Sequence, residues 1–313
     1  DILDATAGAG GSFDLDGGQI LYSFRDTDSF IVGGGAPANV VLYNVQTGVI
    51  SNPFAGSGAP TLTASGANAT LTLGGNNLID GVIIANSGTG AGILGNGVGG
   101  TLTIRNSTIS GGAAGALRIY DNAANVVLGL SNLTLAANGG NILHLDGTGA
   151  GTFTLTQLVN LTVNHSTETG GFILADVTFD SDTLTAGLQA VNAGALTLGT
   201  TGSRITGDGL RLTNVTGTLN FGDLNIANNG GTGLIVANSK LNNFTLGTTG
   251  GAIDTTNGTA INLDPLSINM VLGSVSASGG TYGILLDQVP GNFTATGAVN
   301  VNGATGAGIS VRD

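Results

Sequence analysis

A short motif that returns about every 24 residues is the feature that most constrains how this chain can fold. Each copy has two apolar residues separated by one residue of any type, and Asn or Asp follows within two positions. The steps from Leu210 onward are 24, 27, 23 and 25 residues. A near-constant period of this length is typical of a solenoid built of stacked repeats. The first apolar positions of the clearest copies are Ile93, Leu117, Leu210, Leu234, Ile261, Ile284 and Ile309.

Three short strands are expected in each repeat. Between successive copies lie two more alternating segments, such as residues 219–221 and 224–226. Alternation at period two marks strands with one buried face, and the separating Gly, Asn, Asp and Thr residues suit tight turns. A left-handed hexapeptide helix would need only roughly 18 residues per coil. We therefore predict an all-β fold, a right-handed parallel β-helix solenoid of about 12 rungs of three short strands.

The repeat pattern changes near residue 60. Residues 61–313 are expected to form the regular β-helix, and residues 1–60 to form less regular N-terminal rungs or a cap of the same solenoid. Two intervals are long, 31 residues from Leu143 to Leu174 and 36 from Leu174 to Leu210. Extra residues in a solenoid go outward as loops, often on the binding face. The chain starts without Met and stops inside an expected strand, so we expect a longer or processed protein.

Composition limits the partners. The 57 glycines and 8% charged residues are unusual for a compact globule, but 41% apolar residues are enough for a narrow core. A net charge of −12 with seven basic residues argues against nucleic acid as a partner, because a phosphate backbone is bound by Lys and Arg. The absence of Cys excludes disulfides and is compatible with export. No apolar run is long enough for a transmembrane segment.

Two stretches show the repeat most clearly, residues 77–86 (Asn-Leu-Ile-Asp-Gly-Val-Ile-Ile-Ala-Asn) and 101–111 (Thr-Leu-Thr-Ile-Arg-Asn-Ser-Thr-Ile-Ser-Gly). They resemble the repeats of pectin-lyase-like β-helix proteins. Within that group, a weakly charged, cysteine-free chain rich in Gly, Asn and Thr is similar to passenger domains of bacterial autotransporters and to large surface adhesins. The resemblance covers roughly residues 61–313 and implies a secreted or surface-exposed rod.

The polysaccharide-cutting chemistry of the resembled group has few counterparts in this sequence. Pectin-hydrolysing members carry Asp-Asp, Gly-His-Gly and Arg-Ile-Lys motifs, and none of these occurs. Lyases need clustered Arg or Lys bases, whereas Lys240 is the only lysine and the six arginines are scattered. Hydrolysis would need two carboxylates about 5 to 9.5 Å apart. The densest titratable set gives the catalytic or metal candidates: His144, His165, Asp176, Asp180 and Asp182, with Asp146 and Glu168 between them.

We expect these candidates to be turn and solvent-facing residues rather than a catalytic centre, and we predict no metal site and no cofactor. Asp14, Asp16, Asp26 and Asp28 could bind calcium, but they lack the loop pattern of known calcium motifs and are better explained as turn residues. Thr-Leu-Thr recurs at 61–63, 70–72, 101–103 and 183–185. Outward Thr pairs could order water and bind ice, although Thr also simply favours strands.

Nine Asn-x-Ser/Thr sequons are present. They fit glycosylation of an exported protein, or ladders of Asn side chains stacked at equivalent turns, and we favour the ladders. The sequon asparagines are Asn68, Asn106, Asn132, Asn160, Asn164, Asn214, Asn243, Asn257 and Asn292.

We expect a non-catalytic, adhesin-like structural rod that is extracellular or on a bacterial cell surface. The expected partners are a host or neighbouring cell surface, polysaccharide, or further copies of the chain joined end to end into fibres, because an uncapped β-helix end exposes unpaired strand edges. A polysaccharide lyase or hydrolase and an ice-binding solenoid are the alternatives.

Overall fold

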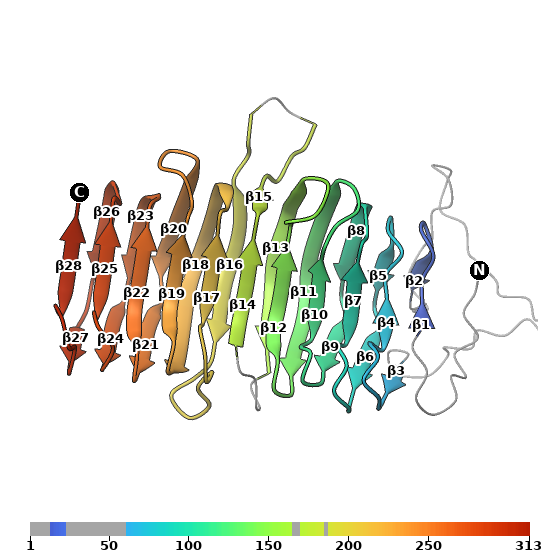
Figure 1. Ribbon diagram of the computed structural model, residues 1–313, viewed down its shortest axis with the longest axis horizontal. Coiled ribbons are helices and arrows are strands. Elements are labelled where there is room, and N and C mark those ends of the chain that lie inside the picture. The colour runs from blue at the N-terminus through green and yellow to red at the C-terminus, as the bar shows by residue number, and fades with distance from the viewer. Residues whose placement is uncertain (1–12, 23–60, 165–169, 185–186) are drawn as a thin grey trace, which may run out of the picture.

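The chain forms a parallel β-solenoid, as predicted (Figure 1). The computed structural model describes residues 13–22, 61–164, 170–184 and 187–313. Within these ranges every regular element is a strand, and every pairing between strands is parallel apart from one isolated bridge. The described residues include no helix that could span a membrane.

One flat sheet, called sheet A, runs the length of the rod. It has eleven strands, which follow one another in chain order. They are β1 (Phe13–Asp14), β4 (Leu71–Thr72), β7 (Ile93–Asn96), β10 (Leu117–Tyr120), β12 (Asn141–Asp146), β14 (Gly170–Ala175), β17 (Leu210–Thr213), β19 (Thr232–Ala237), β22 (Thr259–Asp264), β25 (Ile284–Asp287) and β28 (Ile309–Arg312).

The remaining strands belong to sheet B, which bends into two walls. In some coils one long strand spans both walls, as β11 does when it pairs with both β8 and β9. The strands are β2 (Ile20–Tyr22), β3 (Thr61–Ala64), β5 (Leu78–Asp80), β6 (Ile83–Asn86), β8 (Gly100–Arg105), β9 (Thr108–Gly111), β11 (Val126–Ala137), β13 (Phe153–Val163), β15 (Val177–Phe179), β16 (Val191–Leu198), β18 (Thr216–Asn229), β20 (Phe244–Gly250), β21 (Ala252–Thr256), β23 (Ser267–Leu272), β24 (Ser274–Ser278), β26 (Gly291–Ala295) and β27 (Val299–Asn302).

The strand register confirms the repeat. Leu210 pairs with Leu234, and the column continues through the next predicted positions to Ile309. The predicted number of rungs was too high, because the chain makes about nine turns rather than about twelve. Two turns in the middle of the rod take 29 and 38 residues, and residues 23–60 lie outside the described ranges.

The two long intervals were predicted in the right place but counted from the wrong residue. Leu143 pairs with Phe172, and Phe172 pairs with Leu210, whereas Leu174 lies beside Leu145 and Leu212. Phe172 and Leu174 both face inward on β14 and Asp176 follows them, so the copy of the motif begins at Phe172. The extra residues of the 38-residue turn follow β14, in the segments between β15, β16 and β17.

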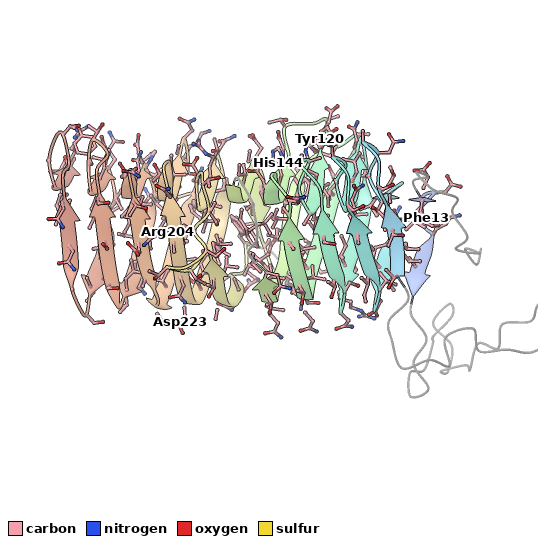
Figure 2. All side chains as sticks on the ribbon, turned by 90° about the horizontal axis from the view of Figure 1, so that it is seen from below. Phe13, Tyr120, His144, Arg204 and Asp223 are labelled. Atoms are coloured by element: carbon pink, nitrogen blue, oxygen red, sulfur yellow. The ribbon has the colours of Figure 1, made fainter. Side chains whose placement is uncertain are left out.

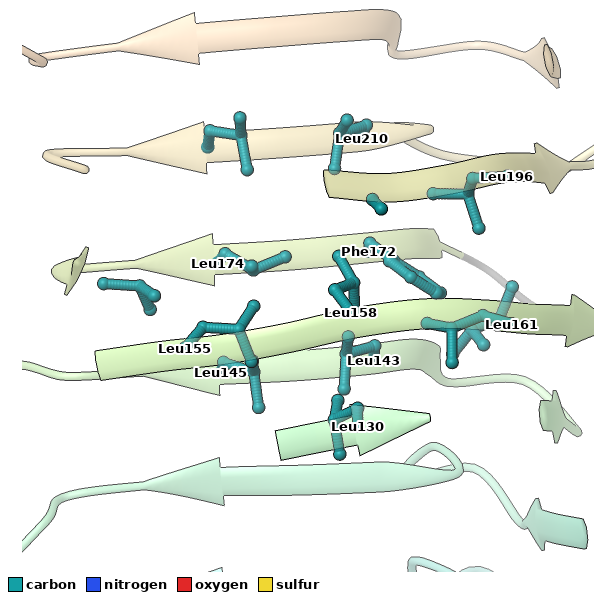
Figure 3. Packing of buried hydrophobic residues seen from close by; sticks show 14 of the residues in the cluster. Leu130, Leu143, Leu145, Leu155, Leu158, Leu161, Phe172, Leu174, Leu196 and Leu210 are labelled. Carbon is teal, nitrogen blue, oxygen red and sulfur yellow. The ribbon is translucent and has the colours of Figure 1, made fainter. Parts of the chain in front are cut away.

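The core is a continuous apolar column inside the coils (Figure 3). Leu143, Phe172 and Leu210 stack on one another from adjacent strands, and each is at most 1% exposed. Burying one such side chain contributes roughly 1.5 to 3 kcal/mol, but only when a neighbouring coil covers it. The composition suggested small and branched core residues, and the structure adds five fully buried phenylalanines in the middle coils: Phe153, Phe172, Phe179, Phe221 and Phe244.

The corners of the coil need left-handed backbone, which Asn and Gly supply. Asn106, Asn132 and Asn160 stand on three successive coils with φ of 51, 52 and 53°. Gly81, with φ of 73°, precedes Asn106 in the same row. Asn tolerates this conformation better than most residues with a Cβ atom.

Of the N-terminal region 1–60, the structure describes residues 13–22. Their strands β1 and β2 pair with β4 and β5, so this segment continues both sheets. Asp26 and Asp28 lie outside the described residues. The boundary at residue 60 stays a prediction, as does the right-handed sense of the coil, which rests on the handedness of parallel crossovers.

Candidate functional site

The structure separates the predicted titratable candidates. His144 lies on β12 in sheet A, Asp176 occupies the corner after β14, and Asp180 and Asp182 follow β15. His165 and Glu168 lie outside the described residues. Among the residues that are described, no three His, Cys, Asp or Glu side chains are grouped closely enough to hold a metal ion.

The three aspartates accept hydrogen bonds that hold turns. Asp176 has a φ of 53°, and its Oδ1 accepts a hydrogen bond from Asn214 Nδ2. Asp180 is 7% exposed, and its Oδ1 accepts from the backbone N–H groups of Asp182 and Gln189 at 3.2 and 2.9 Å. Asp182 Oδ1 accepts from the N–H of Leu184 at 3.0 Å. Backbone N–H groups donate to Asp180 and Asp182 within their own turns, whereas Asp176 is bonded to the next coil through Asn214.

Four of the nine sequon asparagines, Asn106, Asn132, Asn160 and Asn257, take part in the predicted ladders. Asn132 Nδ2 donates to Asn106 Oδ1 at 2.9 Å, and Asn160 Nδ2 donates to Asn132 Oδ1 at 2.8 Å. Asn257 Nδ2 donates in the same way to Asn229 Oδ1 at 2.8 Å. A glycan on Asn132 or Asn160 would take one of the two hydrogens of the Nδ2 group that donates the ladder bond.

The Thr-Leu-Thr segments do not stack on one another. Ile83 follows Thr61 in the next coil, and Val127 follows Thr101. Thr183 lies after β15, outside any strand. A flat array of paired Thr side chains is therefore not formed by these segments.

Sheet A carries a small cluster of polar side chains that the sequence pattern did not predict, here called the Arg118 patch: Arg118 and Tyr120 of β10 with His144 and Asp146 of β12. Arg118 stands beside His144 in register, and strand alternation puts Tyr120 and Asp146 on the same outer face. The Arg118 guanidinium lies 4.7 Å from the centroid of the Tyr120 ring. Figure 2 shows Tyr120 and His144 near one another.

His144 is the titratable group with the clearest electrostatic perturbation. Burial disfavours its charged form and lowers its pKa below the ordinary 6.5, and the Arg118 charge lowers it further. Asp146 opposes both effects. His144 is thus held neutral to lower pH than a free histidine.

A polar depression lies on sheet B. A hollow of about 460 Å³ spans β16, β18, β20 and β23 and is lined by Asn192, Gly194, Asn220, Phe221, Gly222, Gly247, Thr248, Thr249 and Asn269. A second hollow of about 400 Å³ lies beside it, lined by Thr156, Gln157, Val159, Ser181, Ala190, Val191 and Asn192. Because Asn192 belongs to both linings, we treat the two hollows as one surface, the amide groove.

The amide groove arises from a gap in a row of asparagines. Asn192, Asn220, Gly247 and Asn269 occupy successive positions of one row across the four strands. Asn220 Nδ2 donates to Asn192 Oδ1 at 3.1 Å. Gly247 has no side chain, and a Cβ atom placed there would lie 2.3 Å from Asn220 Oδ1. Asn220 Oδ1 occupies the position that a side chain of residue 247 would take, and the row lacks one side chain before Asn269.

Strand irregularities open the groove further. The pairing of β16 with β18 shifts twice, on either side of Gly194, and the pairing of β11 with β13 shifts between Leu128 and Gly129. Bulges of this kind bend a strand locally and re-aim its side chains. A pattern search at a fixed period cannot find them, so the sequence did not reveal this surface.

The lining of the amide groove is uncharged. It offers amide groups, which both donate and accept hydrogen bonds, and Thr and Ser hydroxyls. Its hollows fall within the size range of small-molecule sites. Five strands at about 4.8 Å spacing give a length of about 19 Å along the rod. Such a surface suits an elongated, neutral, hydroxyl-rich ligand.

The same chain was compared with protein-family models, with curated proteins and with solved structures. None of the three comparisons finds a match. The chain is therefore described by its fold, a parallel β-solenoid.

Proposed function

We propose that this chain is a non-catalytic, adhesin-like structural rod that binds a neutral polysaccharide along the amide groove. The single observation that carries the proposal is an uncharged groove that follows the rod axis over five strands, lined by amides and hydroxyls. Sugar hydroxyls pair with such groups, and a neutral ligand avoids repulsion by the net charge of −12.

The extracellular or bacterial cell-surface location belongs to the same proposal. It rests on the resemblance of the repeats to pectin-lyase-like proteins and autotransporter passenger domains, and on the absence of cysteine. A rigid solenoid would hold the amide groove away from its attachment point. The partner would then be polysaccharide on a host or neighbouring cell.

The competing enzymatic function lacks a supporting arrangement in the described residues. Asp176, Asp180 and Asp182 each accept hydrogen bonds from turn residues, and a pair of free carboxylates flanking a groove is not formed by them. The amide groove itself has no titratable lining residue. Hydrolysis of a glycoside needs an acid and a base or nucleophile at the bond.

The test is affinity electrophoresis in gels that contain dextran, β-glucan or galactomannan. We expect at least one of these neutral polymers to retard the protein. The double variant Asn192→Ala/Asn269→Ala should bind about tenfold more weakly, because two hydrogen-bonding amides are lost. Asn292→Ala is the matched control, since Asn292 continues the same row beyond the hollow.

Two outcomes would overturn the proposal. One is equal retardation of the double variant and the wild type. The other is shortening of the polymer by the wild-type protein, measured by size-exclusion chromatography, that disappears in Asp176→Asn or Asp182→Asn. That second result would establish the hydrolase or lyase instead.

A further inference from the structure

The Arg118 patch has an unusual arginine. The other arginines of the described ranges each form an ion pair with an aspartate: Arg105 with Asp80, Arg204 with Asp254, Arg211 with Asp208 and Arg312 with Asp287. Arg118 forms no such pair with a described residue, and its buried Nε has no hydrogen-bond partner. Its guanidinium is held over the Tyr120 ring, at 4.7 Å from the centroid.

An arginine that lacks an ion-pair partner and is stacked on an aromatic ring can bind an anionic ligand. A guanidinium without an ion-pair partner among the described residues can bind a carboxylate, the acceptor that matches its planar fork. Stacking on Tyr120 fixes the plane of the fork before any ligand arrives, so little side-chain freedom would be lost on binding.

The neighbours of Arg118 indicate what else the ligand carries. Asp146, on the adjacent strand, can accept hydrogen bonds from sugar hydroxyl groups, and His144 and the Tyr120 hydroxyl can both donate and accept them. Ile173, beside His144 on β14, and Leu94, beside Arg118 on β7, border the patch on either side without charge. The charged Arg118 side chain is thus surrounded by side chains that can form hydrogen bonds with sugar hydroxyl groups.

The charge balance limits the ligand to a single carboxylate. Asp146 lies within the patch, Asp121 follows Tyr120, and the chain as a whole carries −12. A densely charged polyanion would be repelled by these groups at low salt, whereas one carboxylate on a neutral sugar meets mainly Arg118.

We propose that Arg118, Tyr120, His144 and Asp146 form a second binding site, on sheet A, for a saccharide unit that bears one carboxylate, such as a uronic acid. The proposal deepens the proposed function, on which it rests for the choice of a sugar over a peptide. It places an acidic sugar on sheet A and a neutral chain on sheet B, so the rod would recognise two features of one polysaccharide surface.

The test is titration of the folded 313-residue chain with methyl glucuronoside and methyl galacturonoside, and with their methyl esters, followed by calorimetry or NMR. We expect at least one acid to bind and its ester to bind at least tenfold more weakly, because the ester cannot form the charge-assisted bonds. Arg118→Gln should lose binding, and Arg118→Lys should bind at an intermediate level, since Lys keeps the charge but not the fork.

Arg211→Gln is the matched control. Arg211 occupies the same outward row of sheet A as Arg118 but is paired with Asp208, with its Nε at 2.8 Å from Asp208 Oδ2. This variant should bind the acid as the wild type does. Melting curves of each variant establish that it is folded.

Three outcomes would reject the site: no binding of either acid at about 10 mM, equal binding of acid and ester, or unchanged binding by folded Arg118→Gln. Tighter binding of a short acidic peptide would also reject the choice of a sugar. The Asn192→Ala/Asn269→Ala variant separates the two proposals, because it should lose neutral-polymer binding and keep acid binding if both sites exist. A wild-type protein that binds the acid but none of the neutral polymers supports the Arg118 patch and rejects the amide groove.

Discussion

At the scale of single residues, the corner asparagines combine two roles that other residues do not combine. Asn132 adopts left-handed backbone and also donates to Asn106 and accepts from Asn160. Asn132→Ala should therefore destabilise the protein by about 1.5 to 3 kcal/mol, through the strained backbone and the lost bonds. Asn132→Gly should cost only about 1 kcal/mol, because glycine removes the strain. Urea unfolding followed by circular dichroism measures both, and equal losses would contradict the backbone explanation.

His144 predicts a pH effect on stability. Its pKa is lower in the folded chain than the ordinary 6.5, so the unfolded chain binds more protons as pH falls below that value. The free energy of unfolding should therefore decrease as pH falls from 6.5 toward the lower pKa of the folded chain, and the decrease should be complete below that pKa. His144→Gln should remove this part of the pH dependence, measured as the difference in urea midpoint between pH 7.5 and 5, about one unit or more either side of 6.5. A wild-type difference no larger than that of the variant would contradict the prediction.

At the scale of one strand, neighbouring residues of β14 face alternately into the core and outward. Phe172 is fully buried, whereas Ile173 lies between it and Leu174 on the outer face. Phe172→Ala should cost about 3 to 5 kcal/mol because it leaves a cavity in the apolar column. Ile173→Ala, one position away, should cost much less. Thermal melting of the two variants measures the contrast, and comparable losses would mean that β14 is not oriented as described.

The same strand shows what the sequence could predict. The period of two apolar positions located the stacked strands of sheet A, because every coil must return an apolar pair to the same column. At β14 the motif is also present, beginning at Phe172, but the intervals were counted from Leu174, its second apolar residue. The amide groove could not be predicted, since it depends on bulges beside Gly194 and on Gly247 standing in a row of asparagines. The Arg118 patch needed the register, which brings His144 beside Arg118 from the next coil.

At the scale of the whole molecule, stability depends on each coil covering the one before it. The inward column of sheet A is at most 1% exposed at Leu210, Leu234 and Ile261. Each coil of a solenoid contacts only the coils next to it, so a substitution in one coil changes mainly the packing of the adjacent coils. The two proposed sites lie on different sheets, and each draws on strands of at least two coils.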